Sequence, residues 1–232
     1  MLTLKTPLKT ATSGTVGSIL KPALFAVLMW TASAAGAVPI PGTPVPITLQ
    51  TFVVMLAGLM LPWSQAGAAV ATYLAAGAVG LPVFAGGTST LALVGPSAGF
   101  LFGFLPGVVV IALLRGKSDT SSFAAAARTA GRYLLAALVG GVVVVYAFGF
   151  VIQSALTGAP LAAVALASMG FVVGDAIKAV VASLAAAGLS KLGRCPELLA
   201  RYWPAITALP HRRCGPYGPC RLVFSGSVRR LR

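Results

Sequence analysis

The sequence has few charged residues and almost no acidic ones. Of its 232 residues, 9% are charged, 58% are hydrophobic and only three are acidic. A soluble domain typically carries about 25% charged residues, so this composition excludes an ordinary soluble domain. Aromatic residues make up 8%, whereas alanine and glycine fill the apolar segments, which favours closely packed helices over a barrel of alternating strands. We therefore expect an all-α integral membrane protein with a single helical bundle.

Most residue types that carry out catalysis are missing from the apolar segments. The single histidine, His211, lies near the C-terminus, so an intramembrane enzyme of the Ser–His or metal-dependent type lacks its essential residues. No G-x-x-x-x-G-K-[ST] motif is present, so any coupling to ATP must come from another protein. Cys195, Cys214 and Cys220 lack the C-x-x-C spacing of zinc sites, and we expect ordinary reduced thiols. We expect no enzymatic activity, no metal and no cofactor.

The basic residues lie in three places along the chain. The formal net charge is +14, and all but one of the 17 basic residues precede the first apolar run, fall within residues 115–132, or follow the last run. With six transmembrane helices, these three places are on one side of the membrane, and the loops on the other side carry no basic residue. This is the positive-inside pattern, which predicts cytoplasmic termini and a plasma-membrane location rather than binding to nucleic acid.

The apolar runs and their breaks define the expected organisation. The predicted helices cover residues 22–38, 48–61, 66–80, 98–114, 133–154 and 161–189. We expect a cytoplasmic segment over residues 1–20, a transmembrane domain over 21–192, and a basic, partly disordered cytoplasmic tail over 193–232. The uncharged, proline-rich connection at residues 38–50 is a candidate lid over a cavity. The connection at residues 80–97 is also uncharged, and it can re-enter the membrane where protein covers it.

One acid and one base stand inside the last apolar run. Asp175 and Lys178 are three residues apart, so on a helix they share a face and can reach the same ligand or each other. A charged side chain at mid-membrane costs about 3 kcal/mol, so such residues rarely persist without a functional or pairing role. This pair is the leading candidate site. The alternatives are a structural ion pair, or a side chain that extends to the membrane interface.

Four segments are distinctive in their order along the chain: Val45–Phe52, Gly80–Gly87, Gly95–Phe104 and Gly174–Lys178. Together they resemble the BioY family, the biotin-binding S components of energy-coupling factor (ECF) vitamin transporters. The resemblance covers about residues 20–190. It implies a six-helix fold that holds biotin, as the transported ligand, near the external face under the first external loop. It also implies partners: a membrane coupling subunit and two ATPase subunits of an ECF module, with a homo-oligomer as a further possibility for members that act alone.

The same resemblance points to individual residues. It implies that Asp175 and Lys178 contact the polar groups of biotin. A carboxylate can accept hydrogen bonds from the two ureido N–H groups, and Lys178 can donate either to the ureido oxygen or to the valerate carboxylate. The other candidate substrate-binding residues are Thr48, Gln50, Gly86, Gly87, Phe84, Phe100 and Tyr146.

Three other functions remain open from the sequence. One is an S component for another small vitamin. Another is an ion-coupled transporter or channel that uses Asp175 as a proton site. The third is a purely structural membrane protein, in which substitution of Asp175 or Lys178 changes only thermal stability.

Overall fold

The structure is a computed structural model that describes the backbone of residues 12–38, 45–192, 211–213 and 221–223, and side chains within residues 18–38 and 45–190. The chain divides into two compact units, Met1–Ala187 and Gly188–Arg232. In the second unit, β1 (His211–Arg213) pairs antiparallel with β2 (Arg221–Val223). The cysteines of the tail, residues 39–44 of the candidate lid and residues 1–11 of the predicted N-terminal segment lie outside the described residues.

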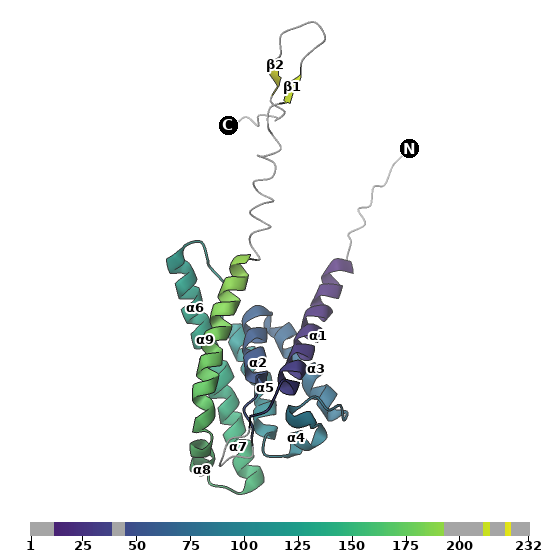
Figure 1. Ribbon diagram of the computed structural model, residues 1–232, viewed down its shortest axis with the longest axis vertical. Helices are drawn as coiled ribbons and strands as arrows, with labels where there is room; N and C mark the ends of the chain where they lie inside the picture. The colour runs from purple at the N-terminus through teal and green to yellow at the C-terminus, as the bar shows by residue number, and fades with distance from the viewer. Residues whose placement is uncertain (1–11, 39–44, 193–210, 214–220, 224–232) are drawn as a thin grey trace, which may run out of the picture. The chain divides into compact units, whose positions relative to one another are not determined.

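The first unit is helical (Figure 1). Its elements in chain order are α1 (Thr12–Ala34), α2 (Gln50–Met60), α3 (Trp63–Ala78), the 3₁₀ turn η1 (Ala85–Gly87), α4 (Thr90–Val94), α5 (Ala98–Leu114), α6 (Phe123–Leu138), the π-helical turn η2 (Val139–Val144), α7 (Val145–Thr157), α8 (Leu161–Ala167) and α9 (Met169–Leu192), the last of which extends into the second unit. An isolated antiparallel bridge also joins Val38 to Ile47.

The first helix begins earlier than predicted. We expected it to start at Pro22, but α1 begins at Thr12 and holds Pro22 in its interior. A proline lacks one backbone donor, yet membrane helices tolerate this because other groups can satisfy the freed carbonyl. The predicted boundary at residues 20 and 21 therefore falls within a continuous helix.

The hydrophilic internal loop is shorter than the predicted span of residues 115–132. Ser122 caps a helix by accepting a hydrogen bond from the backbone N–H of Ala125 at 3.2 Å, and α6 begins at Phe123. The four alanines that follow Phe123 are strong helix formers, which explains this early start. The helix continues through η2 into α7 and ends at Thr157, where Gly158 follows with a φ of +71° that suits glycine. At the start of the loop, Arg115 donates to the carbonyl of Leu59, and burial lowers the pKa of its guanidinium.

The last predicted helix, residues 161–189, is interrupted. α8 ends at Ala167 and α9 begins at Met169, with the fully buried Ser168 between them. The Ser168 hydroxyl donates to the carbonyl of Val164 at 2.8 Å, a side-chain bond of the kind that bends helices. The break occurs about two turns before Asp175, so it falls close to the candidate site.

A stripe of glycines lets α5 approach η2 and α7 closely. A Cβ atom on Gly99 would lie 2.7 Å from the carbonyl oxygen of Phe148, and one on Gly107 would lie 2.7 Å from that of Gly140. Gly103, between them in the stripe, lies similarly close to Val145. The Gly99-x-x-x-Gly103 spacing noted in the sequence thus brings together helices of this chain. Any side chain at these positions would force the two helices apart.

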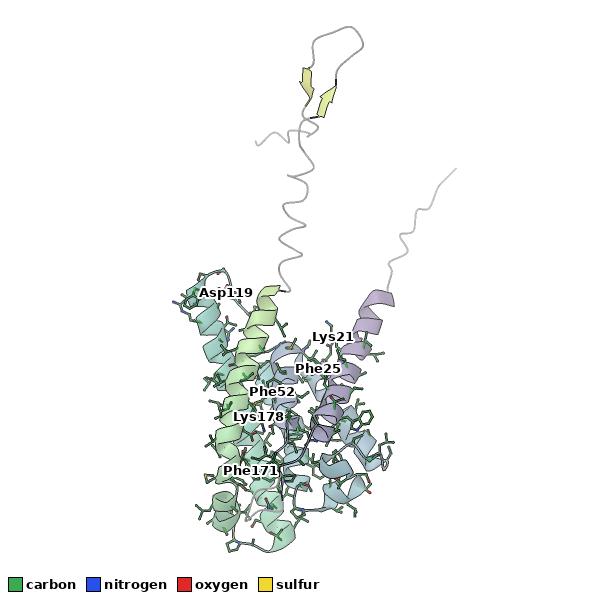
Figure 2. All side chains as sticks on the ribbon, in the orientation of Figure 1. Lys21, Phe25, Phe52, Asp119, Phe171 and Lys178 are labelled. Atoms are coloured by element: carbon green, nitrogen blue, oxygen red, sulfur yellow. The ribbon has the colours of Figure 1, made fainter. Side chains whose placement is uncertain are left out.

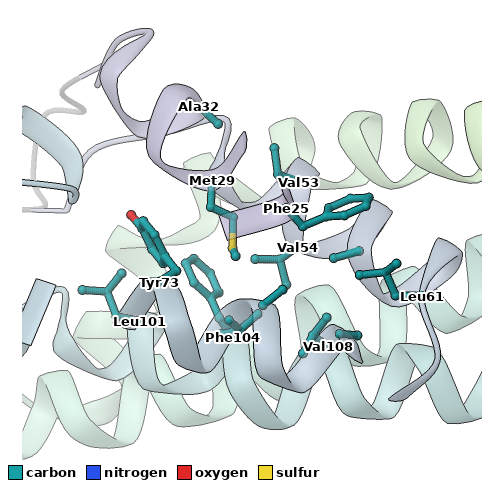
Figure 3. Close-up of a cluster of buried hydrophobic side chains, with 14 of the residues drawn as sticks. Phe25, Met29, Ala32, Val53, Val54, Leu61, Tyr73, Leu101, Phe104 and Val108 are labelled. Atoms are coloured by element: carbon teal, nitrogen blue, oxygen red, sulfur yellow. The ribbon is translucent and has the colours of Figure 1, made fainter. Parts of the chain in front are cut away.

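The two larger of three apolar clusters join most of the described helices. The first joins α1, α2, α3 and α5, and Figure 3 shows Phe25 and Met29 of α1 near Val54 of α2 and Phe104 of α5. The second joins α2, α5, α6 and α9, where alanines of α9 form much of the contact. α2 and α5 belong to both clusters, and they carry the candidate residues Gln50 and Phe100.

Length and hydropathy single out several helical segments of the first unit. Within residues 18–38 and 45–190, two helical segments are long and apolar enough to cross a membrane, Phe123–Thr157 and Met169–Ser190. Shorter apolar helices cover Ser18–Ala34, Gln50–Met60 and Ala98–Leu114. Many large apolar side chains are exposed on these helices, including Leu24, Leu113 and Leu184. Such an exposed apolar surface suits contact with lipid.

Candidate functional site

The two charged residues of α9 form an ion pair. Lys178 Nζ lies 2.8 Å from Asp175 Oδ1, and the side chains are 13% and 7% exposed. Their spacing of three residues places them on one face of α9, which is why they meet. Both residues also line a cavity, so a ligand in the cavity can reach the two side chains while they remain paired.

The start of α2 supplies the other partners of the ammonium group. Lys178 Nζ donates to the backbone carbonyl of Thr48 at 2.7 Å and to the Thr51 hydroxyl at 3.1 Å. The Thr51 hydroxyl in turn donates to Asp175 Oδ1 at 2.9 Å. An ammonium group has three N–H donors, so Asp175, Thr48 and Thr51 together use them all. Sequence reasoning missed Thr51, because its link to α9 spans 124 residues.

The other carboxylate oxygen of Asp175 is held by α7. The phenol of Tyr146 donates to Asp175 Oδ2 at 2.7 Å, a short bond typical of a charged acceptor. The π-helical turn η2 directly precedes Val145 and Tyr146, which both line the cavity. Such single π turns within α-helices are frequent at functional sites.

A second polar network lies beside the pair. The Thr48 hydroxyl donates to Gln50 Oε1 at 3.1 Å, and Gln50 Nε2 donates to the phenol of Tyr73. Tyr73 donates to the carbonyl of Val83 at 2.9 Å, and the Ser33 hydroxyl donates to the same oxygen at 2.5 Å. This network fastens the segment that precedes η1 to α1, α2 and α3. Tyr73 also escaped sequence reasoning, because a tyrosine in an apolar helix has no distinctive pattern.

The cavity has a volume of about 360 Å³, which lies in the range of small-molecule sites. Its polar residues come mainly from the start of α2 and from α9, and aromatic side chains supply much of the rest. Phe84 packs on Gly77, where a Cβ atom would lie 2.1 Å from its ring, and Phe100 packs on Gly149 in the same way. These two glycines make the space that the rings occupy. The cavity therefore pairs a charged wall with an apolar one.

The structure brings together most of the predicted substrate-binding residues, but not all of them. The predicted residues that line the cavity are Thr48, Gln50, Phe84, Phe100, Tyr146, Asp175 and Lys178. Gly86 and Gly87 do not line it: they lie in the exposed turn η1 with φ values of +70° and +71°. These glycines shape the turn between Phe84 and Thr88, and both of those residues reach the cavity.

Several known proteins that are similar in sequence to this chain share one name. Proteins named biotin transporter BioY from Rhizobium etli and Thermotoga maritima are 37% and 42% identical to this chain, over 70% and 67% of it and 87% and 86% of their own lengths. A protein of the same name from Rhodobacter capsulatus is 37% identical over 77% of this chain and 95% of its own length.

A solved structure shares the fold. The crystal structure at 2.1 Å of the S-component for biotin from an ECF-type ABC transporter matches with a TM-score of 0.71 and 26% identity. The match covers 79% of this chain and 95% of that one. In addition, the family model described as the BioY family matches residues 6–194. Because that match covers most of the sequence, this chain belongs to the BioY family.

Proposed function

We propose that this chain is the substrate-binding membrane subunit for biotin uptake, and that it has no catalytic activity of its own. The observation that carries the proposal is the buried ion pair of Asp175 and Lys178 at the wall of an otherwise mainly apolar cavity. Biotin has matching chemistry, with a polar ureido ring fused to an apolar ring and chain. The names of the relatives and of the matching structure support the same ligand.

The hydrogen bonds leave capacity for a ureido ring. A carboxylate offers about four lone-pair positions, and three bonds from Thr51, Lys178 and Tyr146 occupy three of them. The Tyr146 oxygen can itself still accept a bond. One ureido N–H group can therefore bind at Asp175 Oδ2 and the other at the Tyr146 oxygen without breaking the pair. Because Asp175 is buried, such bonds to its charged carboxylate are strong and directional.

We further propose six membrane spans with both ends of the chain in the cytoplasm. α6, η2 and α7 act as one span in this arrangement, as do α8 and α9. Lys21 and Asp119 lie towards one end of the helical unit, and Phe171 lies towards the other (Figure 2). The positive-inside pattern assigns the end with Lys21 and the basic internal loop to the cytoplasm. The cavity, which Phe171 lines, then opens towards the external half of the membrane.

Release of the bound vitamin into the cytoplasm requires energy that this chain does not supply. The sequence contains no nucleotide-binding P-loop motif. We propose that a membrane coupling subunit and two ATPase subunits of an ECF module provide this energy. If the protein acts without such a module, we propose that it does so as a homo-oligomer. Co-purification of tagged protein with such subunits tests this assembly.

Isothermal titration of the purified protein with biotin tests the function directly. We expect sub-micromolar binding, and a strong loss in Asp175→Asn, because the amide NH₂ replaces an acceptor with a donor. A thermal-shift assay with a panel of vitamins tests specificity, since a bound ligand stabilises the folded state. Stabilisation by another vitamin and not by biotin would contradict the proposal. So would uptake driven by a proton gradient in vesicles that contain no ATPase.

A further inference from the structure

The cavity contains one cation and one anion, which neutralise each other. Among the described residues that line it, Lys178 is the basic residue and Asp175 the acidic one, and their charged atoms lie 2.8 Å apart. The other polar side chains that line the cavity are neutral: Thr48, Gln50, Thr51, Thr88, Ser97 and Tyr146. The cavity therefore has no excess positive charge with which to attract an anion.

Lys178 has no N–H donor to spare. Its three donors are directed to Asp175, to Thr51 and to the backbone of Thr48. A ligand carboxylate that took one of these bonds would also bring a second negative charge close to the Asp175 carboxylate. A buried like-charge contact is costly, whereas a neutral carbonyl at the same place is not.

The sequence near the cavity supplies no other cation. Residues 22–114 contain no lysine, arginine or histidine, and this stretch includes residues 39–44, which lie outside the described residues. Residues 133–177 contain none either. All the cavity-lining segments therefore offer Lys178 alone as a basic side chain.

We infer that the Asp175–Lys178 pair receives only the neutral ureido ring, and that no cation pairs with the carboxylate of the ligand. This inference rests on the proposed function. The valerate carboxylate then stays hydrated or meets only neutral donors, because burying it without a counter-charge would cost several kcal/mol. The chain consequently accepts biotin derivatives whose carboxylate has been neutralised, such as biotinamide and biotin methyl ester.

The test is a comparison of three ligands on the purified full-length protein. Isothermal titration is performed with biotin, biotinamide and biotin methyl ester near neutral pH, where only biotin carries a negative charge. We expect the dissociation constants of the two neutral ligands to lie within about fivefold of that of biotin. A loss of about thirtyfold or more for both neutral ligands, the minimum expected when a buried charge pair loses one partner, would overturn the inference.

A comparison of two ligands on two protein variants separates the contribution of Lys178 to binding from that of the other cavity residues. Biotin and biotinamide are titrated against both the wild type and Lys178→Met. If Lys178 serves the ureido ring, the substitution weakens both ligands equally, and the coupling between the lysine and the ligand charge is close to zero. Selective weakening of biotin would show that Lys178 binds the carboxylate.

The outcomes separate the inference from the function beneath it. Failure of the wild type to bind biotin itself removes the proposed function and this inference together. Binding of biotin with rejection of both neutral ligands removes only the inference. Should Lys178→Met fail to fold, the three titrations on the wild type decide alone.

Discussion

The hydroxyl of Thr51 lies 2.9 Å from Asp175 Oδ1 and so joins α2 to α9 across 124 residues of sequence. The same hydroxyl accepts a bond from Lys178 at 3.1 Å, so it contacts both members of the ion pair. A single neutral group thereby fixes the relative position of a carboxylate and an ammonium. We therefore infer that Thr51 positions the pair for the proposed ligand.

We predict that Thr51→Val weakens biotin binding by about tenfold or more, because hydrogen bonds to charged groups contribute about 1.5–3 kcal/mol. Thr51→Ser keeps the hydroxyl and retains most of the affinity. Isothermal titration measures both variants. Thr72→Val, on the exposed face of α3, is the matched control and leaves affinity unchanged. Equal losses in the Val and Ser variants would contradict a role for the hydroxyl.

Tyr146→Phe removes the bond to Asp175 Oδ2 while keeping the ring that packs at right angles against Phe100 and Phe150. We expect biotin affinity to fall by at least about tenfold, in line with the loss of one bond to a charged acceptor. The control is Tyr133→Phe, which alters a buried tyrosine of the second apolar cluster, away from the cavity lining. Titration of both variants with biotin checks the prediction, and similar losses in the two would refute it.

Substitutions in the ion pair should affect thermal stability and biotin binding differently. Asp175→Asn leaves Lys178 as an unpaired, mostly buried charge, and removal of one partner of a buried pair costs about 3–5 kcal/mol of unfolding free energy. Asp175→Asn combined with Lys178→Met removes both charges, so we expect a higher melting temperature than in the single variant. Neither protein should bind biotin tightly. Thermal unfolding in detergent and titration measure the two effects, and a double variant less stable than the single one would contradict this account.

The glycine stripe of α5 is a stability determinant. Gly107→Ala places a Cβ atom 2.7 Å from the carbonyl oxygen of Gly140, so the two helices must separate, and we expect about 1–3 kcal/mol of destabilisation. Gly131→Ala in α6 is the matched control, since its Cβ atom would meet nothing within 4 Å. Alanine has a higher helix propensity than glycine by about 1 kcal/mol, so this control is neutral or slightly stabilising. Thermal unfolding of both variants in detergent gives the comparison. Equal melting temperatures would rule out the close contact.

Helix positions were more predictable than helix ends. The apolar run at residues 98–114 coincides with α5, because glycine and proline precede it and a basic loop follows it. The start of α1 and the cap at Ser122 were missed, because polar residues at a helix terminus resemble loop residues in a hydropathy pattern. The break at Ser168 was missed because neither a proline nor an adjacent pair of glycines marks it in the sequence. The break instead coincides with a buried hydrogen bond from the Ser168 hydroxyl.

The sequence by itself determined the expected class of this protein and its leading candidate site. Scarce charge implies a lipid environment, the clustered cations imply an orientation, and two opposite charges three residues apart on a helix must share a face, because these properties depend on composition and local geometry. Only the tertiary structure decided which groups surround that pair. Thr51 and Tyr146 reach the pair from two other helices, and contacts between residues distant in sequence follow from how the helices pack, which no local pattern encodes.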